Sequence, residues 1–374
     1  MKYLAILGRQ PKISLAELES IFGAAEQIGD SLAVFESNDA PDINRFGSVL
    51  KFAEQLDVSP LDFLSSKDGG KIVFGISDYS HGANTYKTNN EALKLKKILA
   101  RHGIKSRALQ NKAAVLSTAT SHHNQLSEKT NHFELIKVDK TWWNVIGVQN
   151  ITSYAKRDQV RPARDAKVGM LPPKLAQILI NLCGNLSEKS VVLDPFCGTG
   201  VVLQEALLMG YTPYGTDLSE RMVEYSKKNL NWIATEKNLT NQSTYAKMKL
   251  CVGDARDFDW SEKIDAVACE TYLGSPMSKP PVEIKLKEEK QGCSAIILGF
   301  LKNLAKQVKS GTPVVIAVPA WLRENGSYSR LNMLDEIEKL GYNLIRFKNV
   351  SQKDLIYHRE GQIVAREIIV LRKK

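Results

Sequence analysis

The ten residues from Val191 to Gly200, VVLDPFCGTG, are the part of this sequence best suited to bind a small ligand. Apolar β-forming residues lead into Asp194, then into a turn with Gly198 and Gly200, and then into the helical pattern VVLQEALLMG. In such a strand–turn–helix unit, backbone amides at the start of the helix point toward the ligand. The two glycines lack a Cβ, so the backbone can approach that ligand closely. The segment therefore predicts a ligand site at the end of a buried strand.

The chemistry of this turn favours a ligand with a cationic amino group. Leu203 occupies the place of the third glycine in the dinucleotide pattern G-x-G-x-x-G, which argues against NAD. Asp194 would repel a pyrophosphate, whereas it suits an amino group. S-adenosylmethionine has that amino group and no phosphate. We therefore predict that the turn binds S-adenosylmethionine.

Two further acids are expected at the ends of the next strands. Asp217 ends the segment PYGTD, where an acid can accept both hydroxyls of a ribose. Asp254, in VGDARDF, is expected to accept the exocyclic amine of adenine. The alternatives are a helix N-cap for Asp217 and an ordinary turn residue for Asp254. The predicted donor-binding residues are Asp194, Pro195, Phe196, Gly198, Gly200, Asp217, Leu218, Asp254 and Ala255.

The elements that must position these acids alternate between strands and helices from Leu175 to the C-terminus. This alternation favours an α/β fold, a doubly wound Rossmann-like sheet with helices on both faces. The last strand, VAREIIVLRK, follows YNLIRFKNV after a turn containing Gly361, so these two strands are predicted to be antiparallel. The ligand crevice should then lie outside the carboxyl ends of the parallel strands, beside Asp194.

The first 150 residues predict two smaller α/β modules, at residues 1–60 and 61–155, followed by a connector at 156–174. Residues 44–56 are interpreted as a helix, residues 90–102 as a basic helix, and His122 and His123 as part of a polar loop. Apolar segments such as KYLAILG and KIVFGIS are predicted strands.

The net charge of +10 is concentrated in part of the sequence. Eight cations and only one acid, Glu91, lie between Lys87 and Lys112, a density that suits contact with a phosphate backbone. The alternative is an ordinary solvated helix face. In the connector, arginines could contact phosphates or form salt bridges to Asp158 and Asp165. The predicted RNA-binding residues are Lys87, Lys94, Lys97, Arg101, Lys105, Arg107, Arg157, Arg161 and Lys174.

The predicted fourth strand of the large sheet ends in Cys269–Gly274, CETYLG, where a methyl acceptor should meet the donor. With DPFCGTG, GYTPYGTDLS, GDARD and RPARDAKVGMLPPKLAQILINL, this sequence resembles the THUMP-domain tRNA guanosine-N2-methyltransferases, a class I S-adenosylmethionine-dependent family. The resemblance covers essentially the whole chain and is densest from Tyr154 to Trp232.

The resemblance implies a ferredoxin-like module at 1–60, a THUMP-type RNA-binding domain at 61–155 and a methyltransferase domain at 156–374. It also implies methyl transfer to the exocyclic N2 of a guanosine, at position ten of tRNA. Enzymes of that family carry (D/N)-P-P-Y at the fourth strand, where the acid or amide orients the target amine and the aromatic ring stacks on the extruded base.

Both prolines of that motif are absent here. In one register Glu270 replaces the acid, whereas in another Tyr272 keeps the aromatic position and Cys269 replaces the acid. We predict Glu270 and Tyr272 as the catalytic pair. Two other functions stay open, a catalytically silent RNA-binding protein that keeps the donor pocket and a DNA adenine-N6 methyltransferase. The small N-terminal modules argue against the DNA enzyme.

Other features narrow the function further. The five cysteines show no CxxC spacing and no nearby histidine, so we expect reduced thiols, no metal and a cytoplasmic location. No apolar run approaches the length of a membrane span, and the N-terminus does not resemble a signal peptide. The need for a small activating subunit and the oligomeric state are left open.

Overall fold

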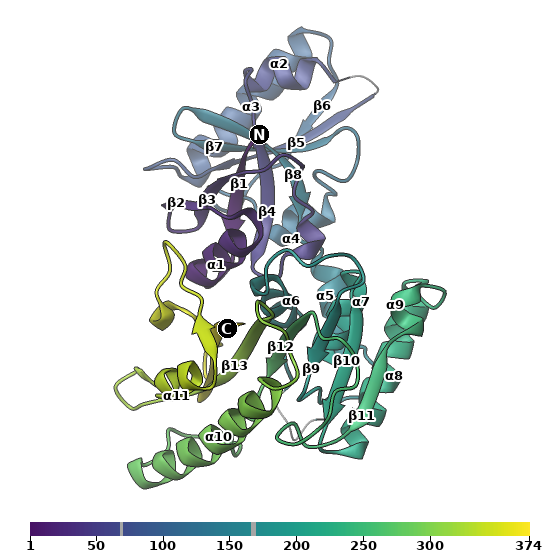
Figure 1. Cartoon of the computed structure of the whole chain (residues 1–374). Helices are drawn as coiled ribbons and strands as arrows, with labels where there is room; N and C mark the ends of the chain where they lie inside the picture. Colours follow the sequence, from purple (N-terminus) through teal and green to yellow (C-terminus); the bar gives the residue numbers. More distant parts are fainter. Residues whose placement is uncertain (68–69, 166–169) are drawn as a thin grey trace. The chain divides into compact units, whose positions relative to one another are not determined.

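The computed structural model describes residues 1–67, 70–165 and 170–374 (Figure 1). The chain forms two compact units, residues 1–18 with 24–153, and residues 19–23 with 154–374. Within the described ranges, no helix is long and apolar enough to cross a membrane. Residues 166–169 of the predicted connector lie outside the described ranges.

The first unit contains one mixed sheet of eight strands. In order across the sheet these are β2 (Glu26–Gly29), β3 (Leu32–Glu36), β1 (Lys2–Leu7), β4 (Val49–Gln55), β8 (Thr141–Val148), β7 (His132–Val138), β5 (Ile72–Asp78) and β6 (Ser106–Ala108). Strand β5 runs parallel to β6 and β7, and β4 pairs antiparallel with β8. The sheet is therefore continuous across residue 60, and the division into two modules there stays a prediction.

The helices of this unit include the predicted basic helix. They are α1 (Pro11–Phe22), α2 (Pro60–Ser65), α3 (Thr85–Arg101) and α4 (Thr118–His123), with a short 3₁₀ turn at Ile43–Arg45. Helix α3 begins where the Asn84 side chain accepts a hydrogen bond from the Lys87 amide at 3.0 Å. Its apolar face packs into a core with β5 and β7, which leaves the cationic face in solvent.

Two expectations for this unit are wrong. Residues 44–56 do not form a helix, because Val49–Gln55 is strand β4, paired with β1 and β8. A strand with neighbours on both sides and buried faces lacks the clean alternation that marks a half-exposed strand, so the pattern of VLKFAEQ does not distinguish a strand from a helix. His122 and His123 end helix α4 and are not part of a loop.

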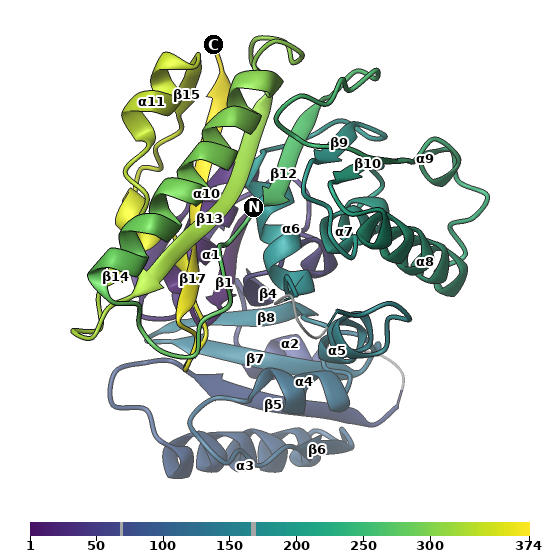
Figure 2. The same cartoon turned by 90° about the horizontal axis from the view of Figure 1, so that it is seen from below.

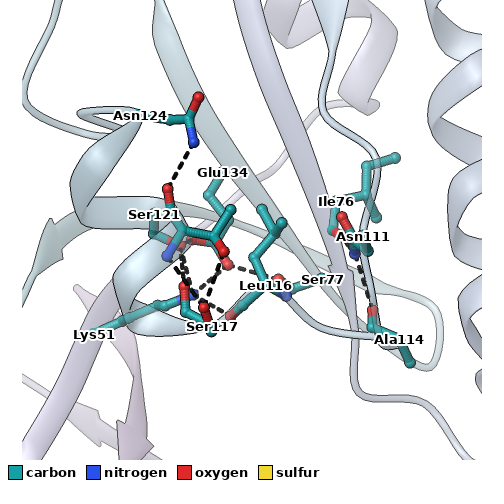
Figure 3. Close-up of polar contacts among 11 residues, drawn as sticks. Lys51, Ile76, Ser77, Asn111, Ala114, Leu116, Ser117, Ser121, Asn124 and Glu134 are labelled. Atoms are coloured by element: carbon teal, nitrogen blue, oxygen red, sulfur yellow. Dashed lines mark hydrogen bonds and ion pairs between the residues drawn. The ribbon is translucent and has the colours of Figure 1, made fainter.

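A buried ion pair connects β4 to β7 in this unit (Figure 3). Lys51 Nζ donates to Glu134 Oε1 at 2.6 Å and to the Leu116 carbonyl at 2.9 Å. The hydroxyls of Ser77 and Ser121 each donate to the same carboxylate at 2.6 Å. Because both charges are paired and hydrogen-bonded, the cluster can be buried, and it holds helix α4 against the sheet.

The second unit contains the predicted doubly wound sheet (Figure 2). Its main strands, in order, are β11 (Lys249–Val252), β10 (Thr212–Asp217), β9 (Val191–Asp194), β12 (Ala266–Glu270), β13 (Pro313–Leu322), β17 (Val364–Lys373) and β15 (Tyr342–Leu344). The first five are parallel, whereas β17 is antiparallel to both β13 and β15. Short strands β14 (Tyr328–Ser329) and β16 (Ile356–Tyr357) extend the edge. The predicted antiparallel end of the sheet is confirmed.

Helices cover both faces of this sheet. The helices of the remaining chain are α5 (Ile151–Gln159), α6 (Pro173–Leu182), α7 (Val201–Leu208), α8 (Glu220–Glu236), α9 (Ser243–Ala246), α10 (Glu283–Leu304) and α11 (Leu334–Lys339), with a 3₁₀ turn at Gln352–Asp354. Helices α10 and α11 share an apolar core with one face of the sheet, and α7 and α8 pack on the other face. The neighbouring residues Leu250 and Cys251 of β11 point to opposite faces, so each packs in a different one of these two cores.

The strand order places a topological switch at β9 and β12. From β9 the chain moves outward through β10 to β11, and it then returns to β12 on the other side of β9. Connections that leave two adjacent strands in opposite directions open a crevice at their carboxyl ends. Asp194 and Glu270 are the last residues of these two strands.

Candidate active site

A cavity of about 870 Å³ lies at the carboxyl ends of β9, β10 and β12. All the described residues that line it belong to the second unit. Ten of the eleven residues predicted from sequence for donor binding or catalysis line it, namely Asp194, Pro195, Phe196, Gly198, Asp217, Leu218, Asp254, Ala255, Glu270 and Tyr272. The structure therefore brings together residues that are up to about 80 positions apart in the chain.

Gly200 is the predicted donor-binding residue that does not line the cavity. It is the N-cap of α7, with φ of +79°, a conformation that suits glycine. A Cβ at this position would lie 2.8 Å from Ser226 Oγ on helix α8. Gly200 is therefore required for the turn and for helix packing, and we withdraw it from the donor-contact set.

Asp194 is a buried acid that forms no ion pair with the described residues. It is 2% exposed, and its Oδ1 accepts a hydrogen bond from the Phe196 amide at 3.1 Å. Burial raises the pKa of its carboxyl well above the usual range, and the nearby carboxylates of Asp217 and Glu270 raise it further. Within the described ranges no Lys, Arg or His forms an ion pair with Asp194. A ligand with a cationic amino group would supply the missing charge, which fits the predicted donor.

Asp217 is held by the backbone on both sides of its carboxylate. The Gly198 amide donates to Oδ2 and the Ser219 amide donates to Oδ1, each at 2.9 Å. The N-cap of helix α8 is Ser219, so Asp217 is not that cap. Each carboxylate oxygen keeps a further lone pair, so the fixed group can accept two hydroxyls of a ligand in the cavity.

The carboxylate of Asp254 forms an ion pair with a neighbouring arginine. Arg256 donates to its carboxylate from Nη2 at 2.6 Å and from Nε at 3.0 Å, and this pairing lowers the pKa of Asp254. Arg256 also lines the cavity, with its aliphatic stem beside Gly299 of helix α10. An adenine amine would have to share the Asp254 carboxylate with Arg256. The contact between Asp254 and adenine therefore stays a prediction.

The part of the cavity beside the end of β12 shows which of the two registers of the fourth-strand motif applies. Glu270 and Tyr272 line the cavity, and Tyr272 is 45% exposed, so its ring is available for stacking. Cys269 is fully buried and packs in the core under helix α10. Successive strand residues point to opposite faces, so Cys269 and Glu270 cannot both reach the cavity from β12. The register with Cys269 in place of the acid is wrong.

The segment after Glu270 is fixed although both motif prolines are absent. The amide and the hydroxyl of Thr271 both donate to the Ala317 carbonyl of β13, at 3.0 and 3.2 Å. At the other end, the Ser275 amide donates to Glu289 Oε2 at 3.0 Å. Gly274, with φ of +85°, leaves room for that carboxylate, since a Cβ there would lie 2.5 Å from Glu289 Oε2. Hydrogen bonds therefore restrict this segment in the absence of the prolines.

Sequence reasoning missed Arg366 on β17, which also lines the cavity. Its Nε donates to Glu270 Oε1 at 2.7 Å, and the two side chains are 4% and 14% exposed. Burial raises the pKa of Glu270, whereas the Arg366 charge acts in the opposite direction. An arginine near the start of the mainly apolar strand VAREIIVLRK was the available signal, but its partner is 96 positions away.

The connector arginines differ from their predicted role. Arg157 donates to both oxygens of Glu205, at 2.6 and 3.2 Å, and stacks 4.4 Å from the Tyr154 ring. Arg161 is 2% exposed, with Nε and Nη1 lacking hydrogen-bond partners among the described residues. Both guanidinium groups are thus enclosed by the domain, and we withdraw them as RNA contacts.

The other predicted RNA-binding residues differ in how far their side chains are exposed to solvent. Lys174 is half-buried, with Nζ 5.1 Å from the centre of the Tyr154 ring. The exposed residues are Lys87, Lys94, Lys97, Arg101, Lys105 and Arg107, all on or beside α3 and β6. Helix α3 packs against β6 in the first unit, so these six cations share one region of that unit.

Comparison with known proteins matches a methyltransferase family to part of the second unit. The family described as UPF0020, RMKL-like methyltransferase domain, matches residues 161–291, which include β9 to β12 and most of the cavity wall. This segment is a methyltransferase domain. The strand order and the antiparallel β17 agree with the class I methyltransferase fold expected from the sequence.

Curated relatives are named as tRNA-modifying enzymes. The chain is 31% identical over 154 residues to a tRNA (guanine(10)-N2)-dimethyltransferase of Methanothermobacter thermautotrophicus, covering 41% of this chain and 40% of that protein. It is 40% identical over 79 residues to an enzyme of the same name from Pyrococcus abyssi, covering 21% and 23% of the two chains. The chain thus spans less than half the length of these relatives.

Among solved structures, TrmN from Thermus thermophilus aligns over 100% of both chains, with 15% identity and a TM-score of 0.49.

Proposed function

We propose that this protein transfers a methyl group from S-adenosylmethionine to the exocyclic N2 of a guanosine in tRNA, at position ten. The observation that carries the proposal is that Asp194, Asp217 and Glu270 line one cavity of a methyltransferase domain. Two of these acids suit the donor, and the third suits an amine acceptor. The names of the matching relatives support the choice of nucleotide and position.

The donor would bind along the ends of β9 and β10. Asp194 would pair with its amino group, and Asp217 would accept hydrogen bonds from its two ribose hydroxyls. Leu218, 72% exposed at the cavity wall, offers an apolar surface to the adenine ring. When bound, S-adenosylmethionine supplies an electrophilic methyl group on a sulfonium.

The acceptor would bind beside Glu270 and Tyr272. A guanine amine is a weak nucleophile because its lone pair is delocalised into the ring, so accurate positioning has to supply most of the rate enhancement. Glu270 would accept a hydrogen bond from the amine and thereby direct its lone pair toward the methyl group. Tyr272 would stack on the extruded base. These steps need no metal ion.

The first unit would hold the tRNA through its phosphates. The six exposed cations named above, which lie on or beside α3 and β6, can each neutralise a phosphate and release a counterion. Such contacts position the RNA without reading its sequence. The choice of nucleotide would then depend on the base that reaches the cavity.

Single-turnover methylation tests this function. Unmodified tRNA would be incubated with an excess of protein and isotopically labelled donor, and the product nucleoside would be mapped by mass spectrometry of the digested tRNA. The expected product is N2-methylguanosine or N2,N2-dimethylguanosine at position ten. The Asp217→Ala variant serves as the control for background transfer.

Binding of both donor and tRNA without transfer would contradict the proposal and favour the silent RNA-binding protein. Transfer to adenine in duplex DNA would instead identify the third candidate. A competition between unmodified tRNA and duplex DNA distinguishes these outcomes in one experiment.

A further inference from the structure

Arg366 and Glu270 meet across an intervening strand. Glu270 is opposite Ala317 in the pairing of β12 with β13, and Arg366 is opposite Pro319 in the pairing of β13 with β17. Paired residues and residues two apart in a strand point to the same face, so all four side chains share one face of the sheet. The small side chain of Ala317 leaves space through which Arg366 Nε reaches Glu270 Oε1 at 2.7 Å.

We propose that Arg366 is a positioning residue: it holds the Glu270 carboxylate by Oε1 so that Oε2 can accept a hydrogen bond from the target amine. This inference rests on the proposed function and names a residue that the sequence motif does not include. Arg366 is nearly buried and does not need to touch the substrate for this role. Its second contact, from Nη1 to the Val364 carbonyl at 3.4 Å, fixes the guanidinium to its own strand.

The ionised form of Glu270 matters for the choice of base. Guanine presents two neighbouring donors, N1–H and the N2 amine, whereas adenine presents its N6 amine beside the acceptor N1. An ionised carboxylate only accepts hydrogen bonds, so it matches the guanine edge and repels the adenine N1. A protonated Glu270 would carry a donor and would lose this match.

The charges around Glu270 make an ionised state dependent on Arg366. Asp194 from β9 is the other acid that faces Glu270 across the cavity, and the charge of Glu270 contributes to the raised pKa of Asp194. On β12 itself, the Cys269 thiol has a pKa raised well above its usual range by burial, so it stays neutral. Arg366 from β17 is the group that favours the carboxylate form.

An unsatisfied acceptor lies on the same hairpin and supports a hydrogen-bonding ligand there. Gln362 lines the cavity four positions before Arg366, and its Oε1 is buried without a partner among the described residues. A buried amide oxygen without a donor is costly unless a ligand satisfies it. A base with several N–H donors would do so.

The test compares pH–rate profiles of single-turnover transfer for the wild type, Arg366→Gln, Arg366→Lys and Glu270→Gln. We expect Arg366→Gln to lower the rate at pH 7 by about 100-fold, the loss that follows a misplacement of about 1 Å. The acid limb of its pH–rate profile should shift to higher pH by about 1 pH unit or more, because the Arg366 charge that favours the Glu270 carboxylate is gone. Arg366→Lys keeps the charge and should leave the limb near its wild-type position, with a smaller rate loss.

A second readout does not depend on activity. It compares the thermal midpoint of Arg366→Gln with that of the double variant Arg366→Gln/Glu270→Gln. As the pH falls from 8 to 6, the midpoint of the single variant should rise relative to that of the double variant. Glu270 without its partner has a folded-state pKa above its unfolded value, so protonation stabilises the fold.

Several results would overturn the inference. A rate loss of equal size at every pH with an unmoved acid limb would show that Arg366 only supports the fold. A thermal-midpoint difference that does not change with pH would show that Arg366 does not control the ionisation of Glu270. If the wild type transfers no methyl group at any pH, the proposed function itself fails, and the role of Arg366 fails with it.

Discussion

The carboxylate of Asp217 accepts a hydrogen bond from the Gly198 amide at 2.9 Å, which ties the end of β10 to the glycine turn after β9. The acid that we propose to bind a ribose therefore also fixes the glycine turn. The turn and the acid belong to neighbouring parallel strands, so their spacing depends on the sheet register, in which Gly215 is opposite Asp194.

Replacement of this acid should weaken donor binding. In Asp217→Ala both the ribose acceptors and the support of the Gly198 amide are lost, at a cost of about 1.5–3 kcal/mol for hydrogen bonds to a charged group. We expect the donor dissociation constant to rise roughly 10- to 100-fold, measured by isothermal titration calorimetry. Asp335→Asn on the exposed part of α11 is the matched control. Unchanged affinity in Asp217→Ala would exclude the ribose role.

Asp194→Asn should separate stability from function. Burial raises the folded-state pKa of Asp194 above its unfolded value, so its ionised form destabilises the fold at neutral pH. The contribution of Asp194 to the free energy of unfolding therefore increases as the pH falls through its folded-state pKa. The Asp194→Asn variant should lack this pH dependence. We expect Asp194→Asn to have a higher thermal midpoint than the wild type at pH 7 and to lose most donor affinity.

The comparison of the two proteins between pH 5 and pH 8 isolates this residue from the other acids. A lower midpoint for the variant at pH 7, or donor binding equal to that of the wild type, would contradict the role of Asp194.

Gly200→Ala should destabilise the methyltransferase domain by about 2 kcal/mol, from the positive φ together with the contact to Ser226 Oγ. Gly210→Ala is a matched control, because Gly210 has φ of +83° but no atom within 4 Å of the added Cβ. We expect the control to cost about 1 kcal/mol, as measured by urea unfolding followed with tryptophan fluorescence. Equal losses in the two variants would show that the contact with helix α8 contributes nothing.

Charge reversal on α3 should weaken tRNA binding without affecting the donor site. The triple variant Lys94→Glu, Lys97→Glu and Arg101→Glu places repulsive charges where phosphates are proposed to lie. We expect tRNA affinity to fall at least tenfold and the slope of affinity against salt concentration to decrease, measured by filter binding at several salt concentrations.

The matched control reverses three exposed lysines of the other unit, Lys227, Lys237 and Lys247, with the same change in net charge. Equal losses of tRNA affinity in the two triple variants would indicate a nonspecific effect of net charge, and would contradict a binding face on α3. Donor affinity should be unchanged in both.

Much of the donor site could be predicted because its signals are local. A strand, an acid, two glycines and a helix follow one another in Val191–Leu208, and Asp217 ends the next strand. Strand β4 could not be predicted in this way, since a strand buried on both faces has no periodicity that distinguishes it from a short helix. Gly200 was recognised as important, but for packing against Ser226 and not for ligand contact.

The amino-acid sequence by itself determined the methyltransferase sheet, the glycine turn with its two acids, and the concentration of cations at residues 87–112. Only the tertiary structure decided which groups are charged, paired and accessible. It placed Arg366 against Glu270, buried Cys269 on the opposite face, and enclosed Arg157 with Glu205. The physical reason is that local patterns follow backbone geometry, whereas ionisation and access depend on neighbours brought together from distant parts of the chain.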